Sequence, residues 1–257
     1  MNHHREPLFV RFARGLLAVF YPKIQLEGLE NLPEDPSILV GNHCHAHGPI
    51  ISETRMDFPH YTWCVAAMLH REEVEAYAFQ DFWSKKPASI QWFYRLISKV
   101  IPVPVSFLLS NVPTIPVYHD NRCVTTFRKT MDALQQGNHI VIFPEHEVPY
   151  NGIVWEFQDK FIDTARFYYK KCGKCLSFVP MYLAPNLRKV FFGAPVRFDP
   201  AAPIEAERKR ICTYLMDSVT VLAAAQPEHI VIPYPNIPKR DYPRNTACEV
   251  AYETETL

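Results

Sequence analysis

The chain has 257 residues, of which 48% are hydrophobic and 21% charged, a composition that is typical of an ordered globular protein and excludes a disordered one. Its 27 acidic and 27 basic residues cancel, so no net field draws it to nucleic acid and we expect no nucleic-acid partner. Seven cysteines, an odd number, are scattered along the chain, which does not indicate a disulfide framework.

The N-terminal segment, residues 1–24, is predicted to contain a short amphipathic helix over residues 8–21. Its apolar face carries four large side chains, Phe9, Phe12, Leu16 and Phe20. Aromatic side chains mixed with arginines suit contact with a membrane surface, and packing on the protein's own core is the alternative. Arginines interrupt the apolar stretch and no small-residue cleavage site follows it, so it does not resemble a signal peptide.

The next part of the chain shows strand and helix patterns in turn. An apolar run over residues 37–40 predicts a buried strand. Pro49 predicts the start of a helix, because proline is favoured in the first helical position. Residues 61–68 begin as a strand, and residues 71–85 are predicted to be helical.

An apolar and aromatic segment covers residues 90–112. It indicates either a strand-and-helix pair of the core, or a membrane-contacting patch or acyl-chain pocket. A charge-free stretch over residues 100–118 approaches the length of a bilayer span. Prolines interrupt this stretch, so we expect no membrane-spanning helix.

From residue 114 onward, strands and helices alternate regularly. Strands are predicted at 114–120, 139–146, 176–183 and 189–198, and helices at 124–138, 160–174 and 203–225. This alternation predicts a single α/β domain, residues 25–226, with a mainly parallel or mixed central sheet and helices on both faces. The tail, residues 227–257, holds five prolines and is predicted to be extended.

Three polar clusters follow apolar strands, each at the carboxyl end of its strand. They are Asn42-His43, His119-Asp120 and Glu145-His146-Glu147. In open α/β sheets the loops at this edge converge on one crevice. The sequence therefore predicts one site, rich in imidazole and carboxylate groups, with His43 as its natural general base.

The order of these blocks resembles that of the glycerolipid acyltransferases of the lysophosphatidate (1-acylglycerol-3-phosphate) acyltransferase type. This chain carries NHxxxxGP, TIPVYHD, VIFPEH and FVPMYL in that order, with helices between them. The family carries NHxxxxD, IPVxR, FPEGT and a strand that contains VP. The resemblance covers residues 25 to 200 and implies an acyltransferase-like α/β fold.

The resemblance also implies a role for each matching residue. The matches are Asn42, His43 and Pro49 in the first block, Ile115, Pro116 and Val117 in the second, Phe143, Pro144 and Glu145 in the third, and Val179 and Pro180 in the fourth. His43 would take the proton from an acceptor hydroxyl as that hydroxyl attacks an acyl thioester. The second and third blocks would hold the phosphate and glycerol of the acceptor.

The same resemblance implies the reaction partners. Acyl-coenzyme A or an acyl carrier protein would be the co-substrate, with no further cofactor and no metal. A lysophospholipid such as lysophosphatidate would be the acceptor, in phospholipid biosynthesis. We therefore expect a cytoplasmic protein that is attached peripherally to the inner face of the cell membrane.

Three positions depart from the family pattern. Gly48 replaces the aspartate that orients the histidine, His119 replaces the phosphate-binding arginine, and His146 replaces the glycine of the third block. Arg122 is a candidate substitute for the lost guanidinium, and the alternative for His119 and Arg122 is a surface turn. Each of these positions is a predicted substrate contact.

The missing aspartate requires another partner for the ring of His43. Loss of the equivalent partner in serine proteases costs about 10⁴ in rate. The candidates are Glu145, Glu53 and a backbone carbonyl. We favour Glu145 as a second catalytic residue, because its loop is expected to face the same crevice.

Gly48 precedes Pro49 and is therefore predicted to be the N-cap of the following helix. Glycine offers no side-chain acceptor to the first free N–H groups. The amides of Ile50 and Ile51 would then be open to an anion such as the acceptor phosphate.

Two alternative functions remain. The chain could be a non-catalytic lipid-binding relative that lost the Asp–His pair. In an extended segment, His43, His45 and His47 would share one face and could bind a metal with Glu145 or His146, as in a hydrolase. A tight turn, with His45 and His47 in solvent, is the alternative to that metal site.

Overall fold

The computed structural model of the chain describes residues 15, 19, 21–79, 88–100, 109 and 111–247. Most of the predicted N-terminal helix and the end of the tail lie outside these residues. The chain divides into two compact units, residues 1–21 with 53–140 and residues 22–52 with 141–257. Each unit is described by itself.

A mixed sheet forms the centre of the second unit. Its strands are β1 (Gln25–Glu27), β2 (Ile38–Gly41), β8 (Ser177–Ala184), β9 (Lys189–Phe192) and β10 (Val196–Arg197). The order is β1-β9-β8-β2, with β10 paired to β8. The pairs β1/β9 and β2/β8 are parallel, and the pairs β8/β9 and β8/β10 are antiparallel. All four residues of β2 are buried, which explains its uninterrupted apolar sequence.

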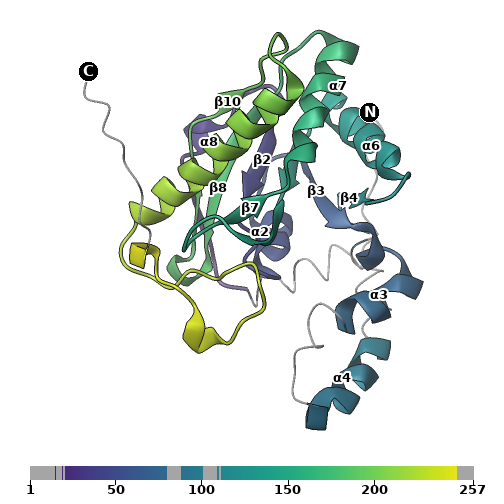
Figure 1. Cartoon of the computed structure of the whole chain (residues 1–257), viewed down its shortest axis with the longest axis vertical. Helices are drawn as coiled ribbons and strands as arrows, with labels where there is room; N and C mark the ends of the chain where they lie inside the picture. The colour runs from purple at the N-terminus through teal and green to yellow at the C-terminus, as the bar shows by residue number, and fades with distance from the viewer. Residues whose placement is uncertain are drawn as a thin grey trace. The chain divides into compact units, whose positions relative to one another are not determined.

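Helices and a hairpin complete this unit. They are α2 (His47–Arg55), whose last residues belong to the first unit, η4 (Asp159–Ile162), α7 (Asp163–Cys172), η5 (Pro185–Leu187), α8 (Ile204–Ala224) and the antiparallel pair β6 (Glu145–Pro149) and β7 (Trp155–Phe157). The long helix α8 packs along β8 (Figure 1). It buries the stripe Ile211, Leu215 and Val219, which recurs at the helical period.

The first unit is also α/β. It contains the parallel strands β3 (His60–Val65) and β4 (Thr114–Val117), the short helix η2 (Ala66–Met68), and the helices α3 (Arg71–Ala78), α4 (Ala88–Val100) and α6 (Cys123–Gln135). Helix α6 packs against β4, and α4 packs against α3. Strand β5 (His139–Ile142) contains the point at which the chain passes from this unit to the second. The predicted α/β class with a mixed, mainly parallel sheet is confirmed.

The C-terminal segment, which we define as residues 227–247, is folded and not extended as predicted. It contains η6 (Lys239–Asp241), η7 (Asn245–Ala247) and a bridge between Ile230 and Arg244. The buried side chain of Asn245 accepts a hydrogen bond from the N–H of His229 at 2.9 Å and donates one to the carbonyl of Ala223 at 2.9 Å. Prolines exclude regular structure here, so a side chain satisfies main-chain groups that a helix or strand would otherwise pair.

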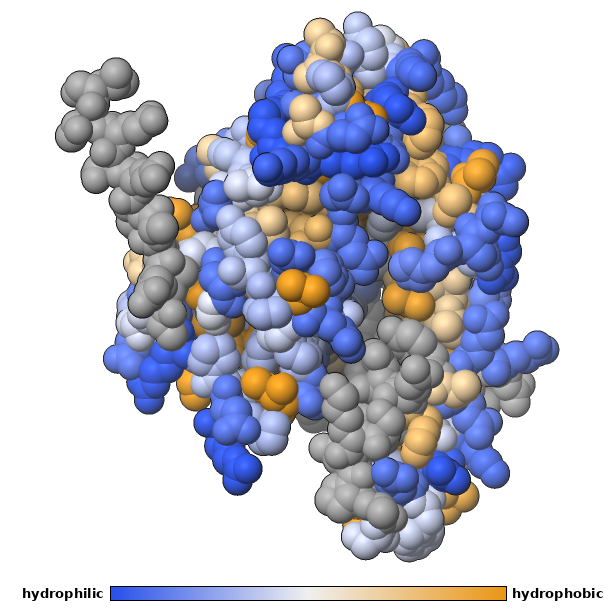
Figure 2. All heavy atoms as spheres, viewed as in Figure 1, coloured by the Kyte–Doolittle hydropathy of each residue, from blue (hydrophilic) through white to orange (hydrophobic). Residues whose placement is uncertain are grey.

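The face of the molecule in Figure 2 is mainly hydrophilic, with apolar side chains in small separate groups. Helix α4 departs from this pattern, because four of its large apolar side chains are exposed: Ile90, Trp92, Phe93 and Leu96. Of the two alternatives for residues 90–112, the exposure of these side chains favours a surface patch over a place in the core. Among the described residues, every helix is too short or too polar to cross a membrane.

Candidate functional site

The turn after β2 carries the predicted base. Asn42, which is 1% exposed, fixes the start of this turn to β8. Its Oδ1 accepts a hydrogen bond from the N–H of Leu183 at 2.8 Å, and its Nδ2 donates to the carbonyl of Leu183 at 3.1 Å. Cys44 and His45 then take left-handed conformations, with φ of 49° and 53°. Such residues cost about 1–3 kcal/mol each and persist only where neighbouring contacts hold them.

Glu145 supplies the second anchor of the turn. This residue begins β6, and its carboxyl group is buried. Its Oε2 accepts a hydrogen bond from the N–H of His43 at 2.6 Å, and its Oε1 accepts one from the N–H of Trp155 at 3.0 Å. Burial raises the pKa of Glu145 to about 7, against the opposing effect of these two main-chain donors.

The predicted contact between Glu145 and the imidazole of His43 is therefore corrected. The carboxylate reaches the main chain of His43, so Glu145 is a positioning residue for the turn. Glu53 belongs to the first unit, where its Oε1 accepts a hydrogen bond from Oγ1 of Thr62 at 3.1 Å. Of the three candidate partners of the ring, the backbone carbonyl remains.

The imidazole of His43 lies between two aromatic rings. Phe143 and Tyr234 meet it edge to face, with ring centroids 5.5 and 6.1 Å away. Burial, followed by the nearby charge of His45, lowers the pKa of His43 to about 4. A hydrogen bond with the main chain of His45 opposes this shift, and only an acceptor raises the pKa of an imidazole, so the ring donates to a carbonyl. His43 is therefore neutral at pH 7 and able to accept a proton.

Gly48 passes too close to His43 to carry a side chain. A β-carbon at Gly48 would lie 2.5 Å from the carbonyl oxygen of His43 and 3.1 Å from Cζ of Phe143. Both distances are shorter than ordinary van der Waals contact. The turn as it stands therefore has no room for an aspartate, and the main chain would have to shift to admit one.

The prediction that Gly48 is the N-cap is wrong, because α2 begins at His47. The N–H of Gly48 donates to the carbonyl of His43 at 3.2 Å, and the N–H of Ile50 donates to the carbonyl of Ala46 at 3.2 Å. Pro49, between them, has no N–H. These donors are therefore already used, and the predicted anion site on the amide of Ile50 is not formed.

The other predicted residues of this unit lie around the same turn and hairpin. The carbonyl of Pro49 accepts a hydrogen bond from Oγ of Ser52 at 2.9 Å, and the carbonyl of Pro144 accepts one from the N–H of Gln158 at 2.9 Å. Nε2 of His146 lies 3.5 Å from Oε2 of Glu156 on the facing strand β7. The second unit thus contains Asn42, His43, Gly48, Pro49, Phe143, Pro144, Glu145 and His146.

His119 and Arg122 belong to the first unit. Nε of Arg122 donates to both carboxylate oxygens of Asp120, at 3.1 and 2.9 Å, and its guanidinium stacks on Tyr118 at 4.5 Å. Hydrogen bonding to Arg122 lowers the pKa of Asp120. Arg122 is thus held in a surface turn by its own neighbours, which matches the alternative to a phosphate contact.

The metal alternative requires converging ligands. Among the described residues, no three His, Cys, Asp or Glu side chains are grouped as a metal ion needs. The segment of the three histidines is a tight turn and not an extended strand. Nε2 of His45 lies 3.4 Å from the carbonyl of Pro235, and its ring meets that of Tyr242 edge to face at 6.3 Å.

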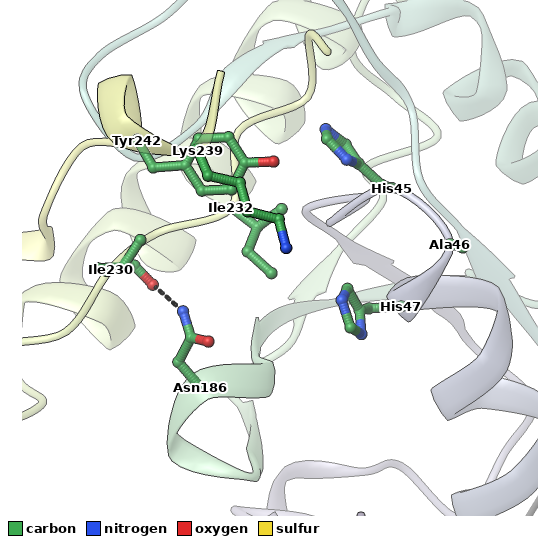
Figure 3. A pocket seen from close by; sticks show the side chains of 8 residues that line it. All are labelled: His45, Ala46, His47, Asn186, Ile230, Ile232, Lys239 and Tyr242. Atoms are coloured by element: carbon green, nitrogen blue, oxygen red, sulfur yellow. Dashed lines mark hydrogen bonds between the residues drawn. The ribbon is translucent and has the colours of Figure 1, made fainter. Parts of the chain in front are cut away.

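The C-terminal segment contributes site residues that the sequence did not reveal. Tyr234 contacts His43, and Lys239 and Tyr242 line a pocket next to His45 and His47 (Figure 3). Their only signal in the sequence is a few aromatic and basic residues among prolines. Such a pattern does not distinguish a folded cover from an extended tail.

No protein-family model matches the chain, and the comparison with curated proteins gave no match. Among solved structures, the crystal structure of the 1-acyl-sn-glycerophosphate (LPA) acyltransferase PlsC from Thermotoga maritima is similar, with a TM-score of 0.47 and 17% identity. The alignment covers 85% of this chain and 83% of that chain.

Proposed function

We propose that the protein is an O-acyltransferase that moves a fatty acyl chain from a thioester to the hydroxyl of a lysophospholipid. The observation that carries this proposal is the neutral imidazole of His43 at the end of β2, with its pKa lowered to about 4. A buried carboxyl group holds the main chain of this residue in place. The order of the four sequence blocks supplies the reaction class.

In the proposed reaction, His43 removes the proton from the acceptor hydroxyl as its oxygen attacks the thioester carbonyl. The tetrahedral intermediate then collapses, the C–S bond breaks, and the imidazolium returns the proton to the leaving thiolate. General-base assistance of this kind contributes about 10²–10⁴ in rate. Because a carbonyl and not a carboxylate accepts from the ring, the imidazolium receives less stabilisation than in a histidine–aspartate pair.

The proposed acyl donor is acyl-coenzyme A or an acyl carrier protein, and the proposed acceptor is lysophosphatidate or a related hydroxyl compound. We further propose peripheral attachment to the cytoplasmic face of the cell membrane through α4. Trp92 is 68% exposed and Leu96 57% exposed on this helix, which carries Arg95 and Lys99 and no acidic residue. Exposed aromatic side chains with nearby cations suit the interface of an anionic membrane.

The test is release of free thiol from acyl-coenzyme A in the presence of lysophosphatidate. Wild-type protein should release thiol and form diacyl product, and His43→Ala should lower the rate by about 10²-fold or more. His70→Ala is the matched control, because His70 is an exposed histidine that contacts Tyr118 in the first unit. Equal turnover by wild type and His43→Ala would refute the proposed role of His43.

A non-catalytic lipid-binding protein is the second candidate function. It is favoured by Gly48, whose close approach to the carbonyl of His43 leaves no space for the carboxylate that the ring would need as an orienting partner. This candidate predicts that wild type and His43→Ala bind lysophosphatidate equally well and that neither consumes thioester. Product formation that depends on His43 would decide for the enzyme.

A further inference from the structure

A pocket of about 310 Å³ lies next to the turn that carries His43. The C-terminal segment forms one side of it, and the turn and the start of α2 form the other (Figure 3). Its polar lining consists of His45, His47, Asn186, Lys239 and Tyr242, with two isoleucines completing the wall. The pocket therefore has more apolar than polar surface, with several hydrogen-bonding groups set in it.

The pocket is cationic. The amine of Lys239 points into the space bounded by the imidazoles of His45 and His47 (Figure 3). Among the described residues, Lys239 makes no ion pair, and none of the residues that line the pocket is acidic. The pKa of His47 is lowered by burial and further by the charges of His45 and Lys239, so these groups repel one another. An anion between them would relieve that repulsion.

We propose that this pocket binds the phosphate monoester of the acceptor, an inference that rests on the proposed function. A phosphate dianion offers acceptor oxygens to the amine of Lys239 and to ring N–H groups of the two imidazoles. Nδ2 of Asn186 donates to the carbonyl of Ile230 at 2.8 Å, which fixes one wall of the pocket. His45 and His43 share one turn, so a phosphate bound by His45 brings the glycerol hydroxyl of the same molecule toward His43.

The binding test uses inorganic phosphate, glycerol 3-phosphate and lysophosphatidate, with lysophosphatidylcholine as the phosphodiester comparison. Calorimetry gives the affinities, and NMR titration of the histidine side chains gives the pKa of His47 with and without ligand. Lys239→Met should weaken binding of glycerol 3-phosphate by at least about tenfold, because it removes one charge-assisted hydrogen bond. Lys209→Met is the matched control, since Lys209 is an exposed lysine of α8 that does not line the pocket.

The proposal expects each phosphate monoester to raise the pKa of His47. Tight binding of inorganic phosphate alone assigns the pocket to free phosphate and overturns the acceptor site. Equal affinity of wild type and Lys239→Met, or no shift of His47, also overturns it. Binding is measured without thioester, so a protein that binds the monoester but releases no thiol refutes the proposed function and leaves the pocket intact. Thiol release without monoester binding supports the proposed function and refutes the assignment of the pocket to the acceptor phosphate.

Discussion

The carbonyl oxygen of His43 lies 2.5 Å from the position that a β-carbon of residue 48 would occupy. The turn therefore favours glycine at position 48. This relationship gives the first prediction. Gly48→Asp and Gly48→Ala should each lower the free energy of unfolding by about 1–3 kcal/mol, because the main chain must shift to admit the side chain.

Thermal and denaturant unfolding would measure this effect. Ala206→Asp is the control, because it adds an aspartate at an exposed position of α8 and should change stability by less than about 0.5 kcal/mol. A Gly48→Asp protein as stable as wild type, with faster thiol release, would contradict the described turn.

The second prediction concerns Glu145. Glu145→Gln keeps the shape of the side chain but leaves one oxygen to accept the two main-chain N–H groups of His43 and Trp155. One donor is then unsatisfied in a buried place, so stability should fall by about 1–3 kcal/mol and thiol release should slow as the turn loosens. Glu147→Gln changes an exposed carboxylate two residues along the chain and should leave both quantities unchanged.

The third prediction is the pH dependence of thiol release. The pKa of His43 is lowered to about 4, so protonation of this base lowers activity only as the pH falls through about 4, whereas protonation of Glu145, with its pKa raised to about 7, acts earlier through the turn. An unburied histidine would give this acid limb near its usual value of 6.5. The profiles of kcat/KM from pH 3.5 to 8 for wild type and Glu145→Gln test the prediction, because Glu145 also titrates in this range. An acid limb near 6.5 that persists in Glu145→Gln would show that the ring of His43 is exposed to solvent.

The same shift affects stability with a defined sign. Between about pH 4 and 6.5, the unfolded chain binds a proton at His43 that the folded chain does not bind. The contribution of His43 to the free energy of unfolding is therefore present above 6.5 and is lost as the pH falls toward 4. His43→Gln should remove this dependence, whereas His70→Gln, at an exposed position, should retain it.

The fourth prediction concerns the C-terminal segment. Asn245 is 1% exposed, and its Nδ2 donates to carbonyls at 2.9 and 3.0 Å while its Oδ1 accepts from His229. Asn245→Ala leaves these buried groups unpaired, so stability should fall by about 2–3 kcal/mol and proteases should cut the segment sooner. Thr246→Ala, at the exposed neighbouring position, should do neither. Limited proteolysis followed by mass spectrometry gives the comparison.

The buried strands and the long amphipathic helices could be predicted because their periodicity reflects burial directly. The apolar run of β2 and the stripe of α8 are both in this class, and so is the polar residue at the end of β2. These signals are local. An uninterrupted apolar run fits a strand buried within a sheet, and an apolar stripe at the helical period fits a helix packed against a sheet. The placement of His43 at a strand end followed from the same logic.

The contacts of the site could not be predicted, because the type of a residue does not say which of its atoms make a contact. The sequence brings Glu145 toward His43 but does not say whether a carboxylate meets the ring or the main chain. The start of α2 at His47 depends on the left-handed turn before it, which no residue preference indicates, since Cys44 is not a residue that favours positive φ. The folded tail depends on buried side chains, among them Asn245, whose partners are main-chain groups far along the chain.

The last prediction concerns the exposed face of α4. Trp92 and Leu96 are both exposed and lie one helical turn apart, so their side chains share a face. The one charged residue between them in the sequence is Arg95, which stacks on Phe79 at 5.2 Å. Trp92→Ser with Leu96→Ser should lower binding to vesicles that contain anionic phospholipid by about tenfold or more, because two large apolar side chains no longer enter the interface.

Val124→Ser, at an exposed apolar position of α6, is the control. Co-sedimentation with vesicles measures the effect, and because the two α4 side chains are already in solvent, the double variant should keep the melting temperature of wild type. Undiminished binding by a folded double variant would assign membrane contact to another part of the chain.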